Sequence, residues 1–147
     1  MLRVVRRQRI TIVYEHAPPM ETINEELQFF GSSLGLFNLR DKDRSAFRIF
    51  IELLKAAKTR RPLSSDELAY LLHLTRATVV HHLHHMMESG LVVSIENRYI
   101  LRAPTLIGLI DELQKDFKKA SDELRKVAQV IDDDLGDLRK STQPTDR

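Results

Sequence analysis

The feature that most restricts the fold of this 147-residue chain is a three-residue gap between two amphipathic helical patterns. Residues 65–72 follow a capping-box pattern, in which Ser64 caps the helix and Glu67 reaches back to it. The next pattern begins at Arg76, so only residues 73–75 join the two helices. Helices joined this tightly must cross at a steep angle. The spacing therefore predicts a helix-turn-helix arrangement.

The flanking segments complete a small domain. Before the pair, the cap sequence Asp43-Arg44-Ser45 and an apolar stripe predict a helix to about Thr59. After it, Gly90 suits the left-handed position that ends the second helix. Residues 91–101 then predict a short β-hairpin with a polar turn at Glu96-Asn97. We expect a mainly α protein with this hairpin as a wing, that is, a winged helix-turn-helix with a long C-terminal coiled-coil helix.

The N-terminal part carries two further patterns. From Val4 to Tyr14, an imperfect alternation of charged and apolar residues predicts one strand, which stops at Pro18-Pro19. We interpret its arginines as a solvated face that discourages strand pairing, rather than as an arm that contacts DNA. Apolar residues then recur at helical spacing between Met20 and Leu34, which predicts a helix.

The C-terminal part is one amphipathic pattern from Thr105 to about Leu138. A helix of that length spans about 50 Å, at ~1.5 Å per residue. Its apolar stripe has alternating spacings of four and three, breaks at Asp134 and resumes at Leu138. The stripe consists of Leu106, Ile110, Leu113, Phe117, Ala120, Leu124, Val127 and Ile131. Such a heptad seam favours a coiled coil between two copies over a helix packed along its own domain.

Charge and cysteine content narrow the class of protein. The formal net charge is +2, but residues 1–14 and residues 40–104 each carry +4, which permits contact with a polyanion. No Cys is present, which excludes disulfides and thiolate chemistry and gives no reason to expect an oxidising compartment. No apolar run approaches the roughly 20 residues of a membrane span. We therefore expect a cytoplasmic protein without a membrane partner.

The helix from Arg76 to Ser89 has two distinct faces. Val79, Leu83 and Met86 share the face that we expect to turn toward the core. The outward face carries hydrogen-bonding groups and no acidic residue before Glu88. Its members are Ala77, Thr78, His81, His84 and His85. Small and hydrogen-bonding groups without a carboxylate suit a helix that enters the major groove of DNA, where Arg76 would contact guanine or a phosphate.

Residues 74–92 resemble the recognition helix and turn of the ArsR and MarR families of winged-helix regulators, and are closest to ArsR at Thr78-Val79, His81-His82-Leu83 and Gly90-Leu91-Val92. The resemblance extends over about residues 45–102. It implies that Arg76, Thr78, Val80, His81 and His84 lie at or near the major groove. It also implies that Arg98, at the wing tip, reaches the minor groove or the backbone. Val80 replaces a hydroxyl residue often found there, so we expect at most an apolar contact with a thymine methyl.

The flanks differ from these families, because a basic strand with an acidic helix is not the usual ArsR start and the last helix is unusually long. We divide the chain into an N-terminal extension (1–39), the DNA-binding domain (40–104), a dimerisation helix (105–140) and a disordered tail (141–147). If an effector exists, its identity is open. Apolar space between the helix at residues 20–34 and the C-terminal helix is one candidate pocket.

The histidine cluster allows a second interpretation. His81 and His85 have the four-residue spacing of a metal pair, but a third ligand would have to come from His16 or His73. The HExxH pattern is absent, and the last helix has no His, so the Asp-x-His pairs that the ArsR resemblance would call for in a zinc sensor are missing. We assign no metal ligand and no cofactor. The sequence contains no phosphate loop and no nucleophile elbow that would indicate an enzyme.

The sequence thus predicts a sequence-specific regulator of transcription that binds double-stranded DNA as a homodimer. The recognition helix (76–89) would lie in the major groove and the wing (91–102) on the minor groove or backbone. Two alternatives stay open. The domain could hold another protein of the transcription machinery, or the regulator could respond to a metal through His81 and His85.

Overall fold

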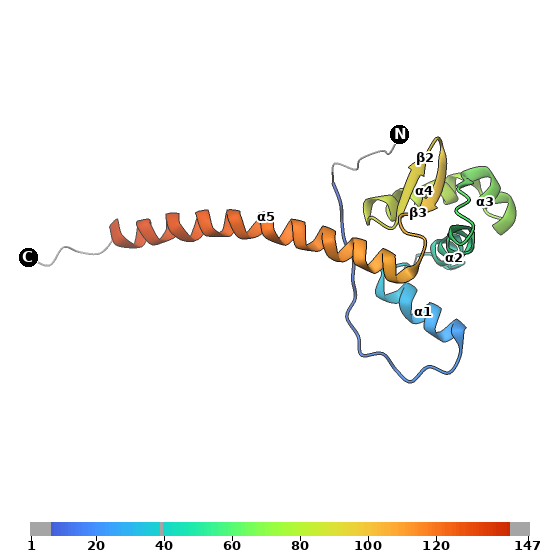
Figure 1. The fold of residues 1–147 in the computed structure, drawn as a ribbon, viewed down its shortest axis with the longest axis horizontal. Helices are drawn as coiled ribbons and strands as arrows, with labels where there is room; N and C mark the ends of the chain where they lie inside the picture. The colour runs from blue at the N-terminus through green and yellow to red at the C-terminus, as the bar shows by residue number, and fades with distance from the viewer. Residues whose placement is uncertain (1–6, 39, 142–147) are drawn as a thin grey trace, which may run out of the picture. The chain divides into compact units, whose positions relative to one another are not determined.

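The computed structural model describes residues 7–38 and 40–141. The chain divides into two compact units, Met1–Leu113 and Gln114–Arg147, which we describe separately. The helices are α1 (Ile23–Ser33), α2 (Ser45–Ala57), α3 (Ser65–Leu72), α4 (Arg76–Glu88) and α5 (Leu106–Ser141), and the strands are β1 (Leu63–Ser64), β2 (Val92–Ile95) and β3 (Arg98–Leu101) (Figure 1). The predicted fold class, a mainly helical winged helix-turn-helix with a long C-terminal helix, is confirmed.

The sheet is small and antiparallel, with the strand order β1-β3-β2. In the hairpin, Val92 pairs with Leu101 and Ile95 pairs with Arg98. The two turn residues between them, Glu96 and Asn97, have φ values of 50° and 63°. Positive φ at both central positions is the requirement of a type I′ turn, whose twist matches that of the strands. The predicted hairpin is therefore confirmed, whereas β1, which adds a third strand beside β3, was not predicted.

Local caps fix the helix-turn-helix pair. The backbone N–H of Glu67 donates to Oγ of Ser64 at 3.0 Å, which starts α3. His73, with φ 55°, ends α3, and the hydroxyl of Thr75 caps α4 by accepting the N–H of Thr78 at 3.2 Å. Gly90, with φ 83°, then closes α4 in the left-handed conformation that the sequence predicted. These bonds satisfy backbone groups that helix ends leave without partners.

The core of the first unit lies between the helix-turn-helix pair, α2, the sheet and the first turns of α5. Its fully buried side chains include Ile49 and Leu53 of α2, Leu68 of α3, and Leu109 of α5. The predicted inward face of α4 is confirmed, because Val79, Leu83 and Met86 are 0%, 0% and 2% exposed. Burying a side chain of this size stabilises the fold by roughly 1.5–3 kcal/mol. These contacts fix which face of α4 remains outside.

The start of α2 differs from the prediction. Arg44 occupies the cap position with φ 54° and makes no side-chain cap, so the predicted Asp43-Arg44-Ser45 cap is wrong. Instead, the carboxylate of Asp41 accepts the backbone N–H groups of Ser45 at 3.0 Å and Ala46 at 2.9 Å. The left-handed turn at Arg44 explains the change, since it folds the chain so that a residue four positions before the helix reaches the free N–H groups.

The N-terminal segment is not a strand where the structure describes it. Residues 7–14 are irregular, and residues 4–6 of the predicted strand lie outside the described residues. The N–H of Arg9 donates to the carbonyl of Glu88 at 2.9 Å, and the N–H of Val13 donates to that of Ser33 at 2.8 Å. Both acceptors lie in the last turn of a helix, where carbonyls have no partner within the helix. The alternation therefore failed as a signal because the segment meets two helix ends rather than a neighbouring strand.

The predicted helix at residues 20–34 is present as α1, which Thr22 caps through the N–H of Glu25 at 3.2 Å. Beside it, an apolar groove of about 410 Å³ lies between α1 and the first turns of α5. Leu27 and Phe30 line it from one helix, and Leu106 and Ile110 from the other. Apolar space therefore exists where the sequence placed a candidate effector pocket.

Some apolar residues of α5 are buried in the first unit, whereas its seam residues in the second unit are exposed. In the first unit, Leu109 and Leu113 are 0% and 2% exposed, whereas Ile110, a predicted seam residue, is 38% exposed. In the second unit, the seam positions spaced by seven are all exposed, at 61% for Phe117, 68% for Leu124, 50% for Ile131 and 59% for Leu138. The seam beyond Leu113 is thus an unpartnered apolar stripe. Of the predicted tail (141–147), Ser141 is the last residue of α5, and residues 142–147 lie outside the described residues. Within the described ranges, no helix has the length and apolar character of a membrane span.

Candidate nucleic-acid interface

Helix α4 leaves one face open to solvent. Arg76, His81 and His84 are exposed, whereas Thr78 and Val80 are half-buried. Because Val79, Leu83 and Met86 are fixed in the core, the exposed side chains cannot turn inward without unpacking the domain. The face that the sequence assigned to DNA is therefore accessible along most of α4.

The first turn of α4 is held by two hydroxyl groups. Oγ1 of Thr75 and Oγ1 of Thr78 lie 2.8 Å apart, and Oγ1 of Thr75 also accepts the N–H of Thr78. The hydroxyl of Thr78 is thus already engaged in the cap. Thr78 contributes to the geometry of the helix start, which sets the direction of the neighbouring Arg76.

Arg76 makes one ion pair in the described part of the chain. Its Nε lies 3.5 Å from Oδ1 of Asp66, which belongs to the first turn of α3. The two side chains are 72% and 78% exposed, and ion pairs between such exposed groups contribute little to stability. Arg76 can therefore exchange Asp66 for another anion at small cost.

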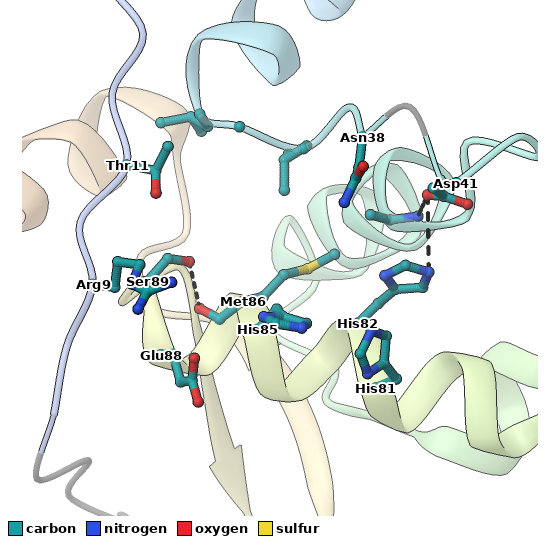
Figure 2. Close-up of a pocket in the computed structure, with 14 residues that line it drawn as sticks. Arg9, Thr11, Asn38, Asp41, His81, His82, His85, Met86, Glu88 and Ser89 are labelled. Atoms are coloured by element: carbon teal, nitrogen blue, oxygen red, sulfur yellow. Dashed lines mark hydrogen bonds and ion pairs between the residues drawn. The ribbon is translucent and has the colours of Figure 1, made fainter.

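Three histidines of α4, His81, His82 and His85, have different surroundings, as Figure 2 shows. The rings of His81 and His85 pack edge to face with centroids 4.6 Å apart. The ring of His82 instead turns toward the loop before α2, where its Nε2 lies 3.8 Å from Oδ2 of Asp41. A cavity of about 260 Å³ lies between the N-terminal segment, that loop and α4. Among residues 7–38 and 40–141, no three His, Cys, Asp or Glu side chains are grouped to hold a metal ion.

The Asp41–His82 pair is partly buried, and its surroundings shift the pKa of both groups. Burial lowers the pKa of the His82 imidazole, although the Asp41 carboxylate opposes the shift. Burial raises the pKa of Asp41, but hydrogen bonds from the backbone N–H groups of Ala46 and Ser45, together with His82, outweigh burial and lower the pKa. His82 therefore packs α4 against the loop before α2, unlike the exposed His81 and His84. Sequence reasoning treated the histidines of α4 as one cluster. A run of adjacent residues does not reveal that one of them, His82, has a partner in a distant loop.

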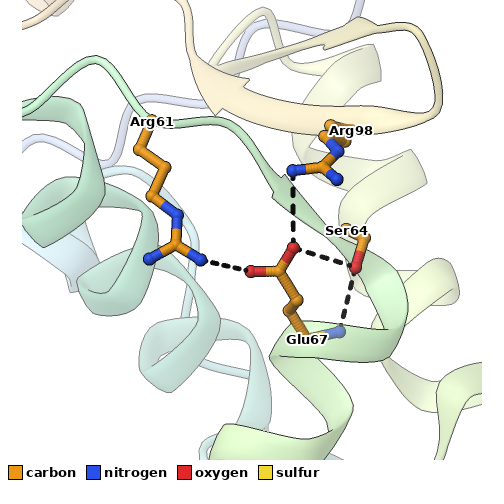
Figure 3. Close-up of polar contacts among 4 residues, drawn as sticks. All are labelled: Arg61, Ser64, Glu67 and Arg98. Atoms are coloured by element: carbon orange, nitrogen blue, oxygen red, sulfur yellow. Dashed lines mark hydrogen bonds and ion pairs between the residues drawn. The ribbon is translucent and has the colours of Figure 1, made fainter.

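The turn end of the wing, where β1 pairs with β3, holds a second polar cluster, shown in Figure 3. Oε1 of Glu67 lies 3.6 Å from Nη1 of Arg98, and Oε2 accepts a hydrogen bond from Nη2 of Arg61 at 3.0 Å. The hydroxyl of Ser64 donates to Oε1 of Glu67 at 3.4 Å. Glu67 reaches back toward its cap residue, as predicted, but its carboxylate also joins two arginines. Sequence reasoning missed Arg61, because its only local signal was its place in the basic pair Arg60-Arg61.

Comparison with known protein families matches part of the chain. Residues 51–94 match the family model described as bacterial regulatory protein, arsR family. The matched range begins inside α2, spans α3 and α4 and ends in β2. It confirms the resemblance to ArsR-type helix-turn-helix regulators and supports a DNA-binding regulator of transcription. Neither the curated proteins nor the solved structures gave a match to the chain.

Proposed function

We propose that this protein is a homodimeric transcription regulator that recognises a specific sequence of duplex DNA through α4. The observation that carries the proposal is the division of α4 into a packed face and an open face. The packed face fixes the helix on the domain, while Arg76, His81 and His84 remain exposed with no acidic residue in α4 before Glu88. A helix that presents its first turns in this way suits the major groove.

Each exposed group has a chemical role in this proposal. The guanidinium of Arg76 would bind guanine or a phosphate, and the imidazoles of His81 and His84 would meet base edges or phosphates. Val80 would make an apolar contact with a thymine methyl. Arg98, at the start of β3, would bind the minor groove or the backbone beside the wing.

The apolar stripe of α5 supports the homodimer. Four side chains spaced by seven, from Phe117 to Leu138, are at least 50% exposed, and a large apolar side chain gains roughly 1.5–3 kcal/mol when it is fully buried. A second copy of α5 would bury them as the seam of a coiled coil. Two copies would also place two α4 helices for half-sites about one DNA turn apart. In the alternative function, another protein covers this stripe.

A DNA-binding assay tests the first part of the proposal. Genomic fragments bound by the protein would be selected and titrated by gel shift at several salt concentrations. We expect binding that weakens steeply with salt and collapses in the double variant Arg76→Ala, His81→Ala. The control is Arg125→Ala with His16→Ala, which removes the same residue types outside α4. If the wild-type protein binds no genomic fragment, the DNA-binding proposal is wrong and a protein-interaction module is favoured.

The dimer is tested at the seam. Leu124→Asp introduces a charge into the stripe, and we expect it to convert a dimer to a monomer in light scattering and to weaken DNA binding. Gln129→Asp is the matched control, because it adds the same charge five residues later on the opposite face of α5. A monomeric wild-type protein at micromolar concentration would contradict the homodimer and leave the stripe to another partner.

A further inference from the structure

Glu67 stands between two arginines that come from different elements. Arg61 belongs to the connection between α2 and β1, and Arg98 is the first residue of β3. Each arginine contacts a different oxygen of the same carboxylate, at 3.0 Å and 3.6 Å (Figure 3). One carboxylate therefore holds two guanidinium groups close together on the surface.

The fold itself brings the three side chains together. Ser64 is both the cap of α3 and the partner of Arg98 in the β1–β3 register. Glu67 follows three residues after the cap, so it lies at the same helix start. Arg61 comes just before β1, after a left-handed Arg60 with φ 53°. The cluster is thus fixed by a helix cap, a sheet register and a turn, none of which requires flexible loops.

The two arginines keep most of their hydrogen-bonding capacity. A guanidinium carries five N–H donors, and each of these groups makes one contact with Glu67. The side chains of Arg61 and Arg98 are 66% and 54% exposed, and together with Glu67 they carry a formal charge of +1. Guanidinium donors suit phosphate oxygens, which accept several such bonds at once. The cluster therefore offers an anion a pair of partly ordered arginines.

We propose that Arg61 and Arg98, held by Glu67, bind a backbone phosphate of DNA beside the turn of the wing. The inference rests on the proposed DNA binding and adds a site and two residues to it. Arg61 is the second ligand of the phosphate, and Glu67 is a positioning residue. Holding both arginines near their bound geometry reduces the side-chain freedom that is lost when DNA binds.

The site is tested with Arg61→Gln and its matched control Arg60→Gln, which removes the same charge from the neighbouring residue. Both would be titrated with the selected genomic fragment and with a random-sequence duplex of about 30 base pairs, because a phosphate contact is independent of sequence. We expect Arg61→Gln to weaken binding to both duplexes by similar factors and to reduce the slope of log K against log salt by about 0.9. Arg60→Gln should retain the wild-type slope. An unchanged slope in Arg61→Gln would overturn the site.

Charge alone and the positioning role predict opposite changes in DNA affinity when the charge of Glu67 is removed. Removing a negative charge near phosphates should strengthen DNA binding if charge were its only effect. We expect Glu67→Gln to weaken binding about 3–10-fold, a range typical of losing the net contribution of one ordinary hydrogen bond. Tighter binding by a folded Glu67→Gln variant, verified by thermal unfolding, would overturn the positioning role. If Glu67→Gln does not fold, Arg61→Gln still tests the site, and failure of the wild type to bind either duplex would refute DNA binding itself.

Discussion

Asp41 gives the sharpest test of how the loop before α2 is built. Its carboxylate accepts two backbone N–H groups at the start of α2, at 3.0 Å and 2.9 Å, and its side chain is 11% exposed. In Asp41→Ala both N–H groups lose their acceptor. A lost N-cap costs about 1 kcal/mol, and a hydrogen bond to a charged group contributes about 1.5–3 kcal/mol. Since such contributions are not additive, we expect a loss of about 2 kcal/mol in the free energy of unfolding.

Urea unfolding at one fixed protein concentration measures this loss. The midpoint should fall while the m-value stays constant. Asp43→Ala is the matched control, because it removes an exposed carboxylate two residues later and should change stability by less than about 0.5 kcal/mol. If Asp43→Ala costs as much as Asp41→Ala, Asp41 is not the residue that caps α2, and the cap at Asp43-Arg44-Ser45 predicted from the sequence is correct.

The pH dependence separates the two roles of Asp41. His82 has a lowered pKa, so protonation costs stability as the pH falls below its ordinary value of 6.5. Without Asp41 the pKa of His82 falls further, so the stability difference between wild type and Asp41→Ala should widen below pH 6.5. The pKa of Asp41 is itself lowered, so its stabilisation is present above its ordinary value of 3.8 and is lost as the pH falls through its folded value. The difference should therefore narrow again below about pH 4. In a His82→Gln background the widening should disappear.

Two further substitutions test the packing that positions α4 and the wing. Leu109→Ala should cost about 2–5 kcal/mol in the free energy of unfolding because Leu109 is fully buried, whereas Ile110→Ala on the 38%-exposed neighbour should cost much less; equal losses would contradict the assignment of the core face of α5. Gly90→Ala should cost about 1–2 kcal/mol by urea unfolding, since Gly90 has φ 83°, while Gly136→Ala, in open space within α5, should not destabilise the protein; an unchanged Gly90→Ala midpoint would refute the strain argument.

Local signals predicted those parts of the fold that short segments decide by themselves. Ser64 and Gly90 act on backbone groups within a few residues, and the turn at Glu96-Asn97 needs only two residues with positive φ. At these positions, the residues that form the sequence pattern are also the residues that stabilise the local structure. The helix-turn-helix pair and the wing were therefore predictable.

The remaining features depend on what a segment meets in space. The alternation at residues 7–14 describes side chains suited to a strand, but its backbone bonds go to the ends of α1 and α4. On α5, a heptad seam and a core-facing stripe overlap, and only packing shows that Leu109 rather than Ile110 is buried. Glu67 shows both cases at once, because its cap is local whereas its pairs with Arg61 and Arg98 need the β1–β3 register.

The composition of α4 determines where DNA affinity must come from in the proposed function. α4 contains one arginine, and with the histidines counted as neutral its only other formal charge is that of Glu88. Non-specific affinity for DNA grows with the number of phosphates neutralised, which α4 alone cannot supply. The neutralising charge therefore has to lie beside the helix, where Arg61 and Arg98 are, and on a second copy of the domain. It follows that substitutions in α4 should mainly weaken binding to the selected fragment, because they remove the preference for its sequence. Substitutions of Arg61 or Arg98 beside the wing turn, or in the α5 seam, should instead weaken binding to every sequence alike.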